Sequence, residues 1–140
     1  MDIHDMPGHL IRRIHQHATH VFQQRVRAAG LDLTPVQFAA LSAIRDTPGI
    51  DQATVAAQIG YDRATIGGVI DRLERKRWIT REISKTDKRA RAVALAEDGH
   101  AVLAAAAPVV RALQGDILGG LSTDEAETVT RLLRKSLDSL

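Results

Sequence analysis

The chain has 140 residues, a formal net charge of +2 and no cysteine, so it has the size of one domain and lacks disulfides, thiolate metal sites and thiol redox chemistry. No apolar run reaches the roughly 18 residues that span a bilayer and no signal-peptide core opens the chain, so we expect a soluble, cytoplasmic protein. Residues 63–91 hold ten Lys or Arg against four Asp or Glu, and such a basic block in a mildly acidic body indicates a polyanionic partner.

Two helices are predicted in the first third of the chain. Apolar residues recur at helical spacing over residues 9–29, and Gly30 can end this helix in a left-handed cap. A second helix begins after Thr34, which forms a capping-box pattern with Gln37, and it runs to about Asp46 before a Thr-Pro-Gly stop.

Residues 51–76 carry the spacing of a helix-turn-helix. Asp51 can cap the first helix, Gly60 supplies the positive φ of the turn, and the second helix begins after Asp62. The small residue Ala56 stands where the two helices cross. Apolar residues hold the five core spacings around the glycine: Val55, Ile59, Tyr61, Ile66 and Val69. This pattern favours a helix-turn-helix over a generic helical hairpin.

Gly67 and Gly68 lie inside the second helix of this motif, where each glycine costs roughly 1 kcal/mol relative to alanine. The pair either kinks the helix or lets a bare backbone approach the floor of a DNA groove or a phosphate, and we favour the close approach.

Two strands are predicted over 78–83 and 90–95, with a charged hairpin tip between them. Four basic side chains at this tip can follow phosphates or enter a minor groove: Lys85, Lys88, Arg89 and Arg91. A long helix follows over 97–119, and Pro108 inside it predicts a kink. A capping box at Ser122 opens a last helix that ends near Leu140.

This order of elements resembles the MarR family of winged-helix transcriptional regulators. The resemblance is carried by the runs LTPVQFAALSAI, DRATIGGVIDRLERKRWI and TDKRARAVAL, and it covers residues 31–140 clearly and the first helix more loosely. It implies a mainly α fold of six helices with a small β-hairpin wing, in a single domain over 1–140. The winged helix-turn-helix would span about 32–96 and the dimerisation helices about 8–29 and 97–140. Ala96 replaces the family's usual threonine, which weakens the cap of the long helix.

The resemblance also implies a homodimeric repressor of a (pseudo)palindromic operator, with half-sites about 10 bp apart. The wing residues above would contact DNA, Arg89 foremost, because Asp87-x-Arg89 matches the family's wing motif. The residues of the recognition helix expected at bases or adjacent phosphates are Arg63, Thr65, Gly67, Gly68 and Arg72.

Members of this family are commonly released from DNA by phenolic or aromatic acids bound between the dimer helices and the winged helix. The stretch GHLIRRIHQ resembles the subgroup that controls benzoate, hydroxybenzoate or nicotinate catabolism. Arg13 and His17 border one edge of the first helix's apolar stripe, and His15 lies at the other edge beside Phe22. An Arg fork or a His donor next to an apolar wall suits an aromatic carboxylate. The alternative is that these polar residues solvate the helix or bond across the dimer seam.

The sequence gives less support to three other classes of function. A metal-responsive regulator is disfavoured because the i, i+2 pair His15 and His17 diverges by about 200° on a helix. An enzyme is disfavoured because no nucleophile–base pair, phosphate-binding glycine loop or catalytic motif is present. A winged-helix protein-interaction module is disfavoured by the basic block. We therefore predict no catalytic residue, no metal and no cofactor, with double-stranded DNA, a second copy and a small aromatic acid as partners.

Overall fold

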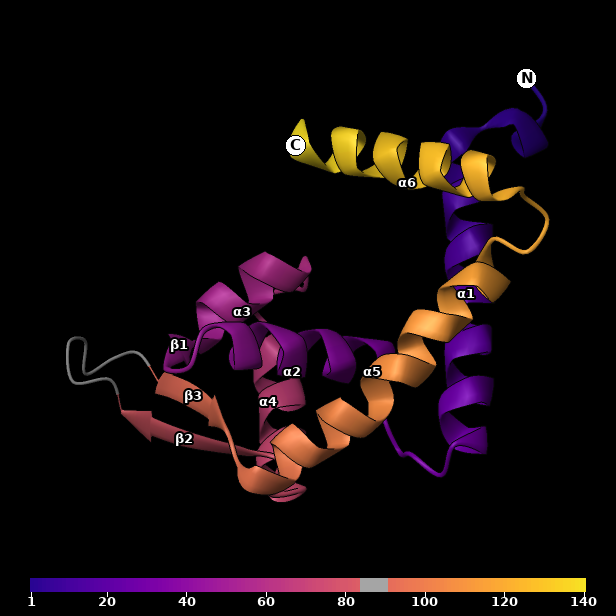
Figure 1. The fold of residues 1–140 in the computed structure, drawn as a ribbon. Helices are drawn as coiled ribbons and strands as arrows, with labels where there is room; N and C mark the ends of the chain where they lie inside the picture. The colour runs from indigo at the N-terminus through magenta and orange to yellow at the C-terminus, as the bar shows by residue number, and fades with distance from the viewer. Residues whose placement is uncertain (84–90) are drawn as a thin grey trace.

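The computed structural model describes residues 1–83 and 91–140 and has the predicted mainly α architecture. Six α-helices and a three-stranded sheet lie within the described ranges (Figure 1). In chain order the elements are a 3-10 turn (Ile3–Asp5), α1 (Pro7–Ala28), α2 (Pro35–Asp46), β1 (Ile50–Asp51), α3 (Gln52–Ile59), α4 (Ile66–Arg75), β2 (Ile79–Ile83), β3 (Arg91–Leu95), α5 (Glu97–Ile117) and α6 (Thr123–Asp138).

The helix-turn-helix and the sheet form one side of the protomer, and α1 forms the other. Helix α5 begins beside the sheet, runs between the two sides and packs along α1, and α6 extends away from its far end (Figure 1). Pro108 lies inside α5, which continues past it without a break. The helix-turn-helix and sheet are therefore joined to α1 through one long helix.

The sheet contains one strand more than the predicted hairpin. Its order is β1-β3-β2 with antiparallel pairs, and Val93 pairs with Ile50 on one side and Arg81 on the other. Gly49 adopts φ 84° and donates its N–H to the carbonyl of Val93 at 3.0 Å. This turn brings the chain after α2 alongside β3, and a two-residue strand leaves no alternating pattern by which the sequence could have revealed it.

Local side-chain caps fix most helix starts as predicted. Thr34 and Gln37 form a reciprocal capping box at α2, and Ser122 and Glu125 form another at α6. At α3, Asp51 accepts the N–H of Thr54 at 2.7 Å, and this hydrogen bond lowers the pKa of the carboxyl from its ordinary value. Helix α5 has no side-chain cap at Ala96, as the missing threonine predicts.

The turn of the helix-turn-helix is longer than predicted. Gly60 has the expected left-handed conformation at φ 67°, but α4 begins at Ile66, because Asp62 accepts the N–H of Ala64 at 2.9 Å and forms a separate turn. Tyr61 lies on this extended turn with 37% of its surface exposed, so its predicted core position is wrong. The other four core spacings of the motif carry buried or partly buried side chains.

The core joins the winged helix to α1 and α5. Its fully buried large side chains include Leu41 and Ile44 of α2, Ile70 of α4, and Leu103 and Leu113 of α5. An ion pair of 2.8 Å between Arg25 and Asp116 adds a polar tie between α1 and α5. The apolar residues of α6 and of the first half of α1 lie outside this core.

Arg77 holds a left-handed conformation, φ 62°, at the residue after the C-cap of α4. Its N–H reaches the carbonyl of Glu74 at 2.9 Å, and the next N–H reaches Leu73 at 3.0 Å, which closes the helix end. A left-handed backbone costs an L-residue roughly 1–2 kcal/mol and costs glycine almost nothing.

We therefore expect Arg77→Gly to raise the free energy of unfolding by about 0.5–1 kcal/mol, less than the full relief because glycine gains entropy in the unfolded chain. Urea denaturation measures the change. The matched control Arg75→Gly makes the same substitution inside α4 and should cost about 1 kcal/mol. A change in unfolding free energy of the same sign in both variants would contradict the left-handed conformation of Arg77.

Candidate nucleic-acid interface and pocket

The predicted base-contacting residues lie around the start of α4. Arg63 and Thr65 are exposed on the turn before the helix, Gly67 and Gly68 occupy its first turn, and Arg72 is exposed in its last turn. The Gly68 N–H donates to the carbonyl of the N-cap residue Thr65 at 3.2 Å. Because α4 begins at Ile66 and not after Asp62, the glycines lie nearer the helix start than predicted, where their cost is smaller. Their contact with DNA stays a prediction.

The two glycines have different surroundings. A Cβ atom at Gly67 would stand 3.3 Å from the side-chain amide of Gln52 on α3, while a Cβ at Gly68 would meet nothing within 4 Å. At Gly67 an added Cβ would require the Gln52 side chain to shift slightly. Gly68 is exposed and leaves a bare backbone on the outer surface, and the close-approach hypothesis stays a prediction for both glycines.

The predicted wing residues fall mostly outside the described ranges. Lys85, Lys88 and Arg89 belong to residues 84–90, and the side chain of Arg91, the first residue of β3, is also outside what the structure describes. Their roles remain predictions from the sequence.

Arg81 of β2 joins the wing to the recognition helix. Its Nη2 atom donates to Asp71 at 2.8 Å and to Glu74 at 2.9 Å, and both carboxylates lie on α4. The hydrogen bond to Glu74 is the main cause of a raised pKa for the Arg81 guanidinium. The side chain is only 15% exposed, and its buried Nε has no partner among the described residues. This contact sets the position of the first wing strand against α4.

Replacing Arg81 with Met should therefore disturb both stability and DNA reading. The carboxylates are half-exposed, so solvent screens them, and we expect a loss of roughly 1 kcal/mol in unfolding free energy. Because wing and α4 would no longer hold one relative position, operator affinity should fall further than stability. Urea denaturation and fluorescence anisotropy measure the two effects. Glu74→Gln should reproduce the change in part, and unchanged operator affinity in both variants would show that the contact does not orient the wing.

A small cavity lies between α1, α2 and α5, and α2 in turn packs against α3. Its volume is about 260 Å³ and its lining is mostly apolar. Phe22 and Phe38 meet edge to face across it, with ring centroids 6.4 Å apart. The lining residues are His15, Ala18, Thr19, Phe22, Pro35, Phe38, Val110, Leu113, Gln114 and Ile117.

The structure divides the four predicted effector residues. His15 and Phe22 line the cavity, whereas Arg13 and His17 are exposed on α1 and are not part of its lining in one protomer. Sequence reasoning missed the walls from α2 and α5, notably Pro35 and Gln114. Those residues are brought to α1 by tertiary packing, and no local pattern marks them.

The polar groups of the cavity are few. Thr19 donates its hydroxyl to the carbonyl of His15 at 3.0 Å, and Gln114 donates its amide N–H to the carbonyl of Val110 at 3.0 Å. The oxygen of the Gln114 side chain and the ring of His15 are therefore the groups suited to a bound molecule. An aromatic ring packed against the two phenylalanines could place one polar substituent near Gln114 and one near His15.

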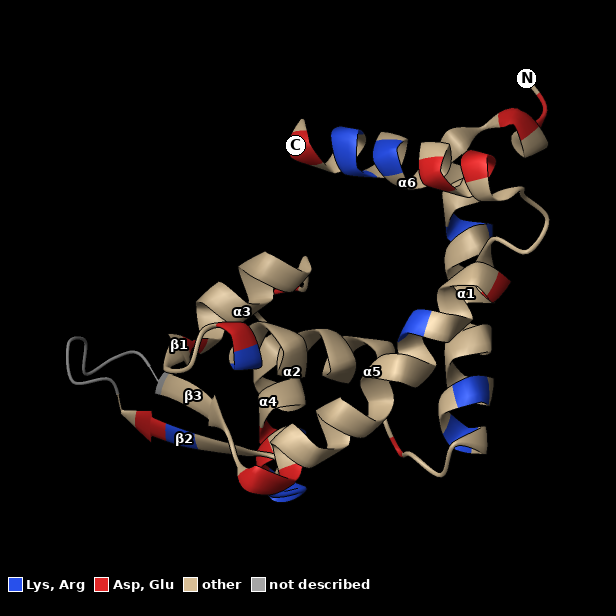
Figure 2. Ribbon diagram, viewed as in Figure 1, with Lys and Arg blue, Asp and Glu red and all other residues tan. Residues whose placement is uncertain are grey.

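A second apolar surface is exposed on α1 and α6. Helix α6 has no buried residue, and its leucines 132, 133 and 137 are 48%, 48% and 67% exposed. Three residues of α1 are similarly exposed: Leu10, Ile11 and Ile14. Acidic residues at the start of α6 and basic residues further along it accompany this stripe (Figure 2). Apolar stripes of this length on two helices indicate an interface.

Two searches of the described ranges are negative. Within residues 1–83 and 91–140, no group of three or more His, Cys, Asp or Glu side chains converges as a metal site. None of the helices described there combines the length and apolar content needed to cross a membrane.

Comparison with known proteins yields matches over nearly the whole chain. The sequence profile of the MarR family matches residues 31–90. The HTH-type transcriptional repressor NicR of Pseudomonas putida is 35% identical over 99% of this chain and 86% of its own length. Two solved structures superpose closely. The first is BpsR of Bordetella bronchiseptica, whose DNA binding is regulated by 6-hydroxynicotinic acid, with a TM-score of 0.90, 31% identity and coverage of 99% and 97%. The second is the PcaV transcriptional regulator of Streptomyces coelicolor with its natural ligand, with a TM-score of 0.88, 29% identity and coverage of 99% and 96%.

Proposed function

The chain belongs to the MarR family, and on that premise we propose that it is a homodimeric DNA-binding repressor, and not an enzyme, that a small aromatic carboxylic acid releases from its operator. The observation that carries the proposal is the cavity between α1, α2 and α5, because its α2 wall packs against α3 of a helix-turn-helix with a basic recognition unit.

DNA reading is assigned to α4 and the wing. The described residues proposed to face bases or phosphates are Arg63, Thr65, Gly67, Gly68 and Arg72. The wing contributes Lys85, Lys88, Arg89 and Arg91. A two-fold dimer presents two such units to successive major grooves, so the operator should be a (pseudo)palindrome with half-sites about 10 bp apart.

The dimer is assigned to the helices outside the winged helix, within a single domain over 1–140. The regions about 8–29 and 97–140 carry the exposed leucines and isoleucines of α1 and α6, which one protomer leaves uncovered. The winged helix-turn-helix over about 32–96 shares its core with the second half of α1 and with α5. A second copy buries the apolar stripes and fixes the distance between the two recognition helices.

The effector is assigned to the cavity by its chemistry. A volume of about 260 Å³ suits a single aromatic ring. Phe22 and Phe38 can pack against the faces or the edge of that ring, and His15 can donate a hydrogen bond to its carboxylate. The free oxygen of Gln114 suits a ring hydroxyl or ring N–H. Hydroxylated benzoic or nicotinic acids combine these groups, and the regulation of BpsR by 6-hydroxynicotinic acid supports this class. Arg13 and His17, exposed on α1, are proposed to complete the site in the dimer.

Release by acid can be tested with one substitution in the cavity. His15→Ala should retain operator affinity in the absence of ligand and should need at least ten-fold more 6-hydroxynicotinate or 4-hydroxybenzoate for half-release, about 1.4 kcal/mol of lost ligand binding. His20→Ala, an exposed histidine of the same helix outside the lining, is the matched control and should behave as wild type. Equal sensitivity of both variants in a gel-shift titration would contradict the proposed site.

A further inference from the structure

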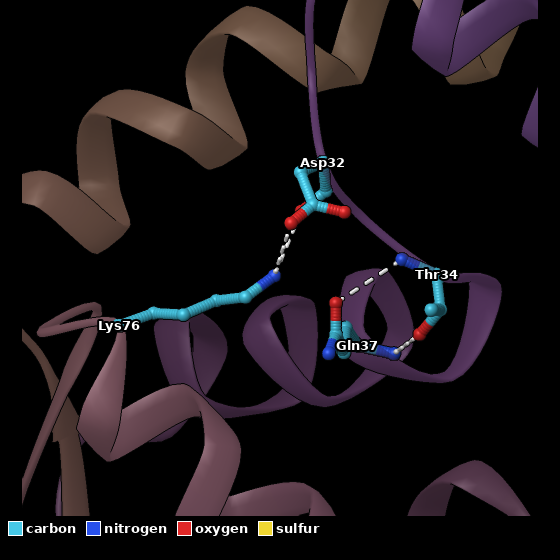
Figure 3. Close-up of polar contacts among 4 residues, drawn as sticks. All are labelled: Asp32, Thr34, Gln37 and Lys76. Atoms are coloured by element: carbon cyan, nitrogen blue, oxygen red, sulfur yellow. Dashed lines mark hydrogen bonds and ion pairs between the residues drawn. The ribbon is translucent and has the colours of Figure 1, made fainter.

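Lys76 connects the end of the recognition helix to the segment that leads into α2. It is the C-cap residue of α4, and its Nζ atom donates to the main-chain carbonyl of Asp32 at 2.9 Å (Figure 3). The carboxylate of Asp32 lies at 3.4 Å, but it is 98% exposed, so solvent screens that ion pair. The main-chain carbonyl is therefore the principal acceptor.

Both ends of this contact are held firmly. The Nζ atom lies 4.4 Å from the centre of the Trp78 ring, which restrains the lysine side chain. On the other side, Leu33 is only 5% exposed, and Thr34 and Gln37 close the capping box that starts α2 (Figure 3). The segment between Asp32 and α2 is therefore anchored to the start of α2 by Leu33 and the capping box.

The same segment continues into the wall of the cavity. Pro35, the first residue of α2, lines the cavity three residues after Asp32, and Phe38 lies one turn further along. A ring bound in the cavity contacts Pro35 and Phe38 at the start of α2, and a displacement of this helix start would also displace the Asp32 carbonyl that accepts from Lys76. One hydrogen bond thus joins the cavity wall to the carboxyl end of α4.

We propose that Lys76 transmits occupancy of the cavity to the recognition helix, by tying the end of α4 to the carbonyl of Asp32. The inference rests on the proposed function, since it takes the cavity as the effector site. Lys76 is a positioning residue: it touches neither effector nor bases, and its effect appears in the coupling between the two sites. Coupling free energies of this kind are about 1–3 kcal/mol, or roughly 5- to 150-fold in affinity.

The test measures operator dissociation constants with and without a saturating aromatic acid, chosen from benzoate, 4-hydroxybenzoate and 6-hydroxynicotinate. In wild type the acid should weaken operator binding at least five-fold. Lys76→Met keeps the aliphatic stem and removes the donor, so this ratio should fall towards one, while calorimetry shows that the acid still binds the free dimer. Lys76→Arg, which can still donate to a carbonyl, should give an intermediate ratio.

Two controls separate coupling from charge. Arg75→Met removes the same positive charge one residue earlier on α4 and should keep the wild-type ratio. Asp32→Ala removes the exposed carboxylate but retains the main-chain carbonyl, so this variant should also keep the wild-type ratio of dissociation constants. A wild-type ratio in Lys76→Met, or an equal loss in Arg75→Met, would overturn the proposal while leaving the proposed function intact. If no acid binds the wild-type dimer or weakens its operator binding, the effector assignment fails and the coupling fails with it.

Discussion

Replacing Leu133 and Leu137 of α6 with glutamate should convert the dimer into a monomer and abolish operator binding. Both side chains lie on a helix that buries nothing within its own protomer, and they are 48% and 67% exposed. Full burial of a leucine contributes about 1.5–3 kcal/mol, and a dimer gains this for each of the four copies. Two buried, unpaired carboxylates per protomer would reverse the sign of that contribution.

Sedimentation equilibrium and a gel shift report the two consequences. The control is Arg131→Glu with Lys135→Glu, which repeats the i, i+4 spacing on the opposite, polar face of α6 and changes the charge by twice as much. It should remain dimeric. Dissociation of the control, or a stable dimer of the leucine variant, would show that α6 does not supply the interface.

Replacing Gly99 of α5 with alanine should cost roughly 3 kcal/mol or more of unfolding free energy, a large share of the 5–15 kcal/mol typical of a domain. A Cβ atom there would stand 1.9 Å from the main-chain oxygen of Trp78, which already accepts the N–H of Ala96 at 2.9 Å. Main-chain atoms cannot rotate aside as a side chain can. Either α5 moves off the sheet or the buried hydrogen bond breaks, and both displace the wing.

The matched control is Gly115→Ala on the same helix, where an added Cβ meets nothing within 4 Å. Alanine is the better helix former by about 1 kcal/mol, so this variant should gain stability. Urea denaturation of both variants tests the prediction by the sign of the change. A loss below 1 kcal/mol for Gly99→Ala would contradict the close approach of α5 to Trp78.

Local chemistry explains which elements the sequence predicted. The capping boxes at Thr34 and Ser122, the Asp51 cap and the left-handed Gly60 each need only three or four neighbouring residues, and the structure confirms all of them. The wing strand β2 begins at Ile79, one residue later than predicted. The alternation of apolar and polar residues already begins at Trp78, so the local pattern alone does not mark the true start.

The features that escaped prediction depend on residues far apart in the chain. Strand β1 exists only because β3 lies beside it, and the requirement for glycine at position 99 comes from the Trp78 carbonyl. The cavity combines three helices, so the apolar stripe of α1 could indicate His15 and Phe22 but not Gln114. The sequence places Arg13 and His17 at an edge of the apolar stripe of α1, but in one protomer neither residue lines the cavity.

Anisotropy titrations with DNA from upstream of its own gene measure whether this chain binds DNA as a dimer and is released by an aromatic acid. The predicted result is two protomers on one palindromic site, an affinity that falls steeply and linearly in log–log form as salt rises, and release by a hydroxylated aromatic acid. Binding that is insensitive to salt, or operator affinity unchanged by every acid of the panel, would contradict it.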